Sequence, residues 1–174
     1  MALTRRRFLQ VGIAGTAVLV AVRLVERSVA PAGAAHRVLD EGTAALVGAL
    51  AAVVLEGALP AEPALRASAL HEVVEAFDRA ISGLAPAVRG EIDQLLGTLR
   101  LRPARWALTG VWDPLEEASA PAISAFLTRW RESRFDLLRA GYQALTQLIN
   151  AAWYDNPRAW PAIGYPGPPS LTAR

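Results

Sequence analysis

T-A-A-L-V-G-A-L-A-A-V-V-L, residues 43–55, is an almost wholly apolar stretch of 13 residues. A helix needs about 20 residues to cross a membrane, so this stretch is too short to span one. A surface helix keeps a polar face, and these residues offer none. We therefore expect residues 43–55 to form the central buried helix of the fold, ended by Pro60 and Pro63.

Four further helices are predicted from apolar residues that recur every three or four positions. Pro86 stands where a first helical residue would, a fresh helix is expected from Pro121, and the last helix should run from about Asp136 to Tyr154. The apolar stripes are Leu70, Val73, Val74, Phe77, Ile81 and Leu84; Val88, Ile92, Leu95, Leu96 and Leu99; Ile123, Phe126, Leu127 and Trp130; and Leu138, Tyr142, Leu145, Ile149 and Ala152.

The segment 100–113 breaks this pattern and mixes arginines with tryptophans. Its members are Arg100, Arg102, Arg105, Trp106 and Trp112. The run D-P-L-E at 113–116 then resembles the start of a helix. Asp113 would be the N-cap, Pro114 the first helical residue, and the Glu116 side chain would reach back to the N-cap amide. We expect an irregular segment followed by one short turn of helix.

These patterns predict an all-α protein with a single small domain of about five helices over residues 35–154. Alternating runs of β-branched residues are absent, so strands are not expected. Residues 155–174 are rich in proline, which forbids a regular helix or a central strand. The segment still contains Trp160, Ile163 and Tyr165, and disordered tails are poor in such residues. We expect an ordered, extended arm.

The first ten residues, M-A-L-T-R-R-R-F-L-Q, resemble a twin-arginine export signal, with Arg5, Arg6, Phe8 and Leu9 as its signal residues. An apolar core at 11–22 and A-x-A cleavage sites follow, so residues 1–34 read as a signal peptide. This route carries folded proteins, usually because a cofactor is inserted before export. An ordinary amphipathic amino-terminal helix is the alternative.

Composition bounds the remaining chemistry. Residues 1–34 hold five of the 18 arginines and one of the 16 acids, which leaves residues 35–174 with 13 arginines, 15 acids and a net charge of −2. A slightly acidic exported domain has no reason to bind nucleic acid. The chain has no cysteine, which excludes disulfides, thiolate catalysis, iron–sulfur ligation and covalent haem attachment.

No catalytic or cofactor motif is found. A G-x-G-x-x-G motif is absent, so we expect no Rossmann-type FAD or NAD site in this chain. His71 and Glu75 have i, i+4 spacing that can bind a metal, but no third ligand is evident, and a solvated histidine is favoured. His36 lies near the expected mature terminus. The adjacent Glu116 and Glu117 would point apart on a helix.

The five tryptophans all lie in the second half of the chain. Trp130 and Trp153 are expected in the core. Trp106, Trp112 and Trp160 stand in irregular segments, and Trp is enriched at binding hot spots, so we predict that they bind a partner together with Ile163 and Tyr165. For the arm, packing on this domain and packing on a partner are both left open.

Residues 126–169 contain R-E-S at 131–133, L-L-R-A-G-Y-Q-A-L at 137–145, A-W-Y-D-N-P at 152–157, Trp160, and I-G-Y-P-G-P-P at 163–169. This set resembles the gluconate 2-dehydrogenase subunit 3 family, whose members typically carry a twin-arginine signal. The segment around Trp106 and Trp112 is not matched, so the substrate is not inherited from the family name.

The resemblance implies an accessory subunit and not an enzyme. Members of that family stand beside a large FAD-containing subunit of the glucose–methanol–choline (GMC) oxidoreductase type, often with a multihaem cytochrome c subunit. The small subunit supplies the signal that takes the folded flavin subunit through the twin-arginine translocase. The expected location is periplasmic, at the outer face of the cytoplasmic membrane. A free-standing exported helical enzyme or ligand-binding protein is the alternative.

Overall fold

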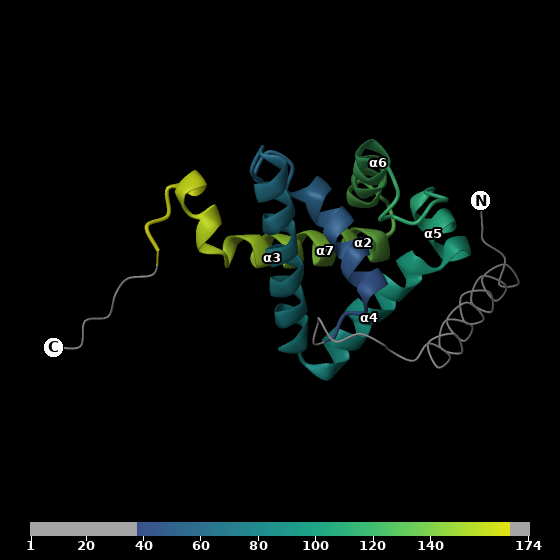
Figure 1. The fold of residues 1–174 in the computed structure, drawn as a ribbon. Helices are drawn as coiled ribbons and strands as arrows, with labels where there is room; N and C mark the ends of the chain where they lie inside the picture. Colours follow the sequence, from purple (N-terminus) through teal and green to yellow (C-terminus); the bar gives the residue numbers. More distant parts are fainter. Residues whose placement is uncertain (1–37, 168–174) are drawn as a thin grey trace, which may run out of the picture. The chain divides into compact units, whose positions relative to one another are not determined.

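Residues 38–167 are described by a computed structural model, and within this range the chain forms helices, turns and loops without a strand (Figure 1). The predicted all-α class is confirmed. The elements are α2 Glu41–Val54, α3 Pro63–Ser82, α4 Pro86–Arg100, α5 Arg102–Thr109, α6 Ala120–Arg131, α7 Asp136–Tyr154, and the short 3₁₀ helices η1 Pro157–Ala159 and η2 Pro161–Ile163.

Helix α2 lies at the centre of these residues and contacts α3, α4, α6 and α7. Leu46, Val47, Leu50 and Ala51 are fully buried on it, as expected for a helix without a polar face. The helix ends at Val54, one residue before the end of the predicted stretch 43–55, with Leu55 as its C-cap. A turn in which Gly57 has a positive φ of 82° reverses the chain before those prolines are reached.

Helices α6 and α7 have the bounds expected from periodicity, and the prediction that Trp130 and Trp153 lie in the core is confirmed. Helix α5 was not expected. Its inward-facing position is taken by Arg105, which is buried, so a count of apolar residues misses the helix. The short helix expected at 113–116 is also wrong, because those residues form turns that lead into α6.

The extended conformation expected for residues 155–169 is wrong over the part that the structure describes. Two 3₁₀ helices follow α7, and Pro157 and Pro161 stand at their first positions, where a missing N–H costs nothing. Ala159, the last residue of η1, is buried in the same core as the α-helices. The arm is therefore a folded appendage of the helical domain.

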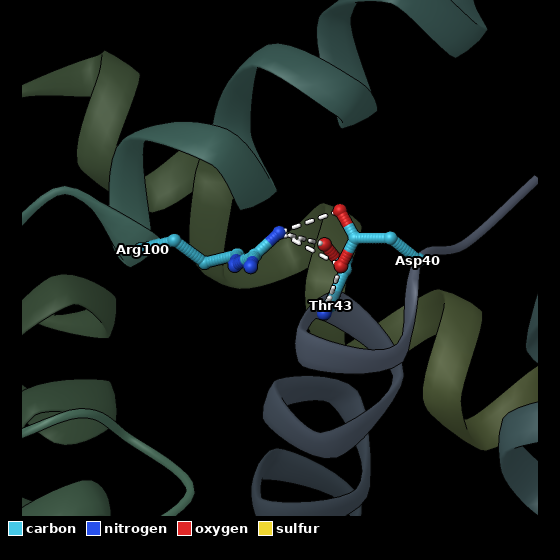
Figure 2. Close-up of polar contacts among 3 residues, drawn as sticks. All are labelled: Asp40, Thr43 and Arg100. Carbon is cyan, nitrogen blue, oxygen red and sulfur yellow. Dashed lines mark hydrogen bonds and ion pairs between the residues drawn. The ribbon is translucent and has the colours of Figure 1, made fainter. Parts of the chain in front are cut away.

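The amino-terminal end of α2 is fixed by polar contacts with the end of α4 (Figure 2). Asp40 is the N-cap, and its Oδ1 accepts a hydrogen bond from the Thr43 amide at 2.7 Å. The Arg100 Nη1 donates to both Asp40 carboxylate oxygens, at 2.8 and 2.6 Å, and to the Thr43 hydroxyl at 3.0 Å. Partial burial raises the pKa of Asp40, but the Thr43 amide and the Arg100 charge outweigh it, and the pKa lies below its ordinary value.

Asp40→Ala removes both the cap and the ion pair. We expect the free energy of unfolding at neutral pH to fall by about 1 kcal/mol, the usual cost of losing an N-cap, because a half-exposed ion pair adds little. Asp40→Asn keeps the cap oxygen and should cost less. Urea unfolding of the three proteins measures both differences.

The same variants carry a pH signature. The folded-state pKa of Asp40 is lower than the unfolded one, so its stabilisation is present above about pH 4 and is lost as the pH falls through the folded value. The difference in unfolding free energy between wild type and Asp40→Asn should shrink toward zero over that range. A difference that stayed constant down to the acid limit would contradict a role for the ionised carboxylate.

Gly141 on α7 is required by its contact with Trp130. A Cβ at position 141 would lie 2.9 Å from the Trp130 Cζ3 atom, and that ring is buried and donates its Nε1–H to the Leu108 carbonyl at 2.8 Å. Gly141→Ala should therefore lower the unfolding free energy by about 1 kcal/mol or more, because overpacking outweighs the gain in helix propensity.

Gly90→Ala in α4 is the matched control, since a Cβ there meets no atom within 4 Å. Its unfolding free energy should rise by about 0.5–1 kcal/mol. Equal effects of the two substitutions in thermal or urea unfolding would show that the Trp130 contact does not constrain position 141.

Candidate partner-binding site

The five residues predicted to bind a partner fall into two separate clusters. Trp106 and Trp112 belong to α5 and the loop after it, whereas Trp160, Ile163 and Tyr165 belong to the arm. In Figure 1 the arm continues from the carboxyl end of α7, and α5 lies toward the other end of that helix. The structure does not bring all five together.

The two tryptophans of the first cluster touch each other and face solvent. Their ring centroids are 6.2 Å apart with an interplanar angle of 78°, an edge-to-face arrangement, and both side chains are more than half exposed. Gly110, with a φ of 68°, ends α5 and turns the chain so that Trp112 comes back beside Trp106. The pair is a preformed aromatic patch.

The buried Arg105 holds this patch in place. Its Nη1 donates to the carbonyls of Leu99 and Arg100, at 3.2 and 3.0 Å, and its Nη2 donates to the Trp112 carbonyl at 2.8 Å. The guanidinium therefore ties the end of α4 to the loop that carries Trp112. Arg105 is one of the three arginines of the segment 100–113, and no local signal in the sequence marks it as the buried one.

The arm cluster has a packed base and an exposed tip. Trp160 is partly buried against the core, its Nε1 donates to the Tyr154 carbonyl at 3.0 Å, and its ring meets Tyr165 edge to face at 5.3 Å. The Tyr165 amide donates back to the Trp160 carbonyl at 3.0 Å, across Gly164, whose φ is 67°. Ile163 and Tyr165 remain 55% and 44% exposed. The arm thus packs on its own domain through Trp160 and presents two apolar side chains outward.

Glu72 on α3 fastens the base of the arm. Its Oε2 accepts a hydrogen bond from the Asn156 Nδ2 at 2.6 Å, and its Oε1 lies 3.3 Å from Arg158. Asn156 in turn caps η1 by accepting the Arg158 amide. One carboxylate therefore connects α3 to two residues that lie more than 80 positions further along the chain.

A polar cavity of about 340 Å³ lies at this base. Its lining residues are Glu72, Glu75, Ala76, Arg79, Ala152, Asp155, Asn156 and Pro157. They offer carboxylates, one guanidinium and one amide, but no nucleophile with a neighbouring base. The cavity has no arrangement that assigns it a reaction.

The other candidate groups do not converge. His71 Nε2 lies 3.5 Å from Glu75 Oε1 on the surface of α3, as their spacing suggested, and residues 38–167 contain no cluster of three groups able to hold a metal ion. Glu116 and Glu117 are exposed in a turn. The signal residues Arg5, Arg6, Phe8 and Leu9, and also His36, lie outside the described residues.

Among the described helices, none combines the length and the apolar character needed to cross a bilayer. Comparison of the chain with protein-family models, with curated proteins and with solved structures found no match.

Proposed function

We propose that this chain is the non-catalytic small subunit of an exported, FAD-dependent dehydrogenase complex of the GMC type that oxidises a sugar, polyol or alcohol. It escorts the folded flavin subunit through the twin-arginine translocase and stabilises it in the periplasm. One observation carries this proposal. The run T-R-R-R-F-L-Q at 4–10 resembles an export signal used for folded proteins, yet the chain has no cofactor motif of its own. The partner holds the FAD, and a multihaem cytochrome c subunit can complete the complex.

Two exposed aromatic surfaces support an accessory role. Large apolar side chains in water cost about 25 cal/mol per Å² of exposed area, and a partner that covers them recovers this free energy. Aromatic residues on ordered supports lose little entropy on binding, which makes them good interface anchors. The Trp106–Trp112 pair and the arm tip both have this character.

The resemblance to gluconate 2-dehydrogenase subunit 3 adds to this. Its motifs fall on the end of α6, on α7 and on the arm. In the arm, the motif residues Ile163 and Tyr165 are exposed. In α7, the motif residue Gly141 packs against the Trp130 ring. The residues that carry the resemblance therefore include one that packs against a buried ring, Gly141, and two that are exposed, Ile163 and Tyr165.

Replacing Arg5 and Arg6 by lysine tests the escort role. We expect both this protein and its flavin partner to stay in the cytoplasm, because one signal serves two polypeptides. Arg7→Lys, which changes the spacer arginine beside the pair, is the matched control and should leave export intact. The readout is flavin-subunit activity in periplasmic and cytoplasmic fractions. A flavin subunit that reached the periplasm in the double variant would contradict the proposal.

Serine substitutions at Ile163 and Tyr165 test the arm as a partner contact. Truncation after Tyr154 would also remove the buried Ala159 and could destabilise the fold, so the two exposed side chains of the arm are substituted instead. We expect the affinity for the flavin subunit to fall at least about tenfold with helicity unchanged, as for a hot-spot pair. Leu65→Ser with Val88→Ser, on the exposed faces of α3 and α4, is the control.

Unchanged affinity in the arm variant would leave the arm without this role. A stable ligand-containing monomer that binds no flavin subunit would favour the alternative, a free-standing exported ligand-binding protein or enzyme.

A further inference from the structure

The segment 129–139, R-W-R-E-S-R-F-D-L-L-R, joins α6 to α7 and is called here the α6–α7 tip. Phe135 and Leu137 on this tip are 57% and 82% exposed. Leu137 has the highest exposed fraction of the large apolar side chains among the described residues. These two side chains are distinct from both aromatic clusters described above.

Phe135 also occupies a position that suits it poorly. It is the N-cap of α7, where Ser, Thr, Asp or Asn would accept a hydrogen bond from the first turn, and its side chain makes none. It does not compensate by packing, since it faces solvent. A residue that breaks a local rule without a structural gain is expected where function uses it.

The tip is also basic. It holds four arginines against Glu132 and Asp136, a net charge of +2 in 11 residues, whereas residues 35–174 as a whole carry −2. Arg131 pairs with Glu132, and Arg139 pairs with Asp136. Arg129 donates its Nη2–H to the Thr109 carbonyl at the end of α5, whereas Arg134 has no carboxylate partner among the described residues.

The free charge and the apolar group lie together. The Arg134 guanidinium carbon lies 4.9 Å from the centroid of the Phe135 ring, which is a cation–π contact. A surface that binds the tip must therefore accept a cation and an apolar group at one place.

We propose that the α6–α7 tip docks on an anionic lipid surface. Phe135 and Leu137 enter the boundary between headgroups and acyl chains, and the arginines contact lipid phosphates. A stable protein interface needs about 800 Å² per partner, which two side chains do not approach, whereas a bilayer rewards a few inserted apolar groups beside cations. The acidic remainder of the domain orients the tip toward the lipid.

This docking leaves the arm accessible. The tip adjoins the amino-terminal end of α7 and the arm follows its carboxyl end. A helix of 19 residues separates them by about 28 Å. The proposal does not depend on the identity of the partner that binds the arm.

The chain has no cysteine, so one introduced cysteine can carry a polarity-sensitive fluorophore at a chosen place. Ala140→Cys places the label on the exposed side of α7 beside the tip, and Ala67→Cys places it on α3 as the matched site. Label position, and not total binding, is the readout, so the amino-terminal segment of the full chain does not confuse the result. We expect a blue shift at 140, and none at 67, with vesicles of phosphatidylcholine and phosphatidylglycerol, and no shift with phosphatidylcholine alone.

Phe135→Ser with Leu137→Ser, and separately Arg131→Gln with Arg134→Gln, should weaken the vesicle-dependent shift at 140 at least about tenfold. Serine at 135 improves the N-cap, so unfolding would not explain the loss. The control is Leu65→Ser with Val88→Ser. No shift at 140, equal shifts at 140 and 67, or a shift at 140 that appears only with the flavin subunit would overturn the proposal, the last because the tip would then contact protein.

Discussion

The structure depends on the burial of the inner positions of α2, the most apolar of the described α-helices. Its apolar residues need cover, and contacts with α3, α4, α6 and α7 bury Leu46, Val47 and Leu50, while Ala45 stays exposed. Its small residues let neighbouring helices approach closely: a Cβ placed at Gly48 would lie 3.7 Å from the Val74 side chain. Because the middle of α2 has no polar side chain, polar contacts that position the helix can form only at its ends. The buried Asp78 of α3 accepts the amides of Val38 and Leu39, at 3.0 and 2.8 Å, and so ties the entry of α2 to its largest neighbour.

Periodicity was sufficient to predict the parts of the fold in which apolar residues face inward. Helices α6 and α7 were found because Trp130 and Ile149 fall on uninterrupted stripes. Helix α5 was missed because the residue on its buried face is Arg105, whose two Nη atoms donate to three carbonyls that no local pattern reveals. The arm was expected to be extended because its prolines exclude an α-helix, but a short 3₁₀ helix tolerates proline at its first position, and Pro157 and Pro161 use this.

In the candidate site, too, some features could be predicted from the sequence and others could not. Trp106 and Trp112 were singled out because they stood in a segment expected to be irregular; the structure places Trp106 in helix α5, and both side chains are exposed. Their edge-to-face contact, and the hold of Glu72 on Asn156 across 84 positions, depend on tertiary structure and could not be predicted. Phe135 was overlooked for a different reason. Nothing in the sequence pattern marks it, and only the structure shows that Phe135 is the exposed N-cap residue of α7.

Helix α7 connects the α6–α7 tip to the arm. Its inner face fills the core with Leu145, Ile149 and Trp153, so its axis is held by the same packing that buries α2. The arm at one end and the α6–α7 tip at the other are therefore kept at a set separation. On the two proposals above, a flavin subunit bound through the arm would be held at a defined height over the lipid surface that the tip contacts.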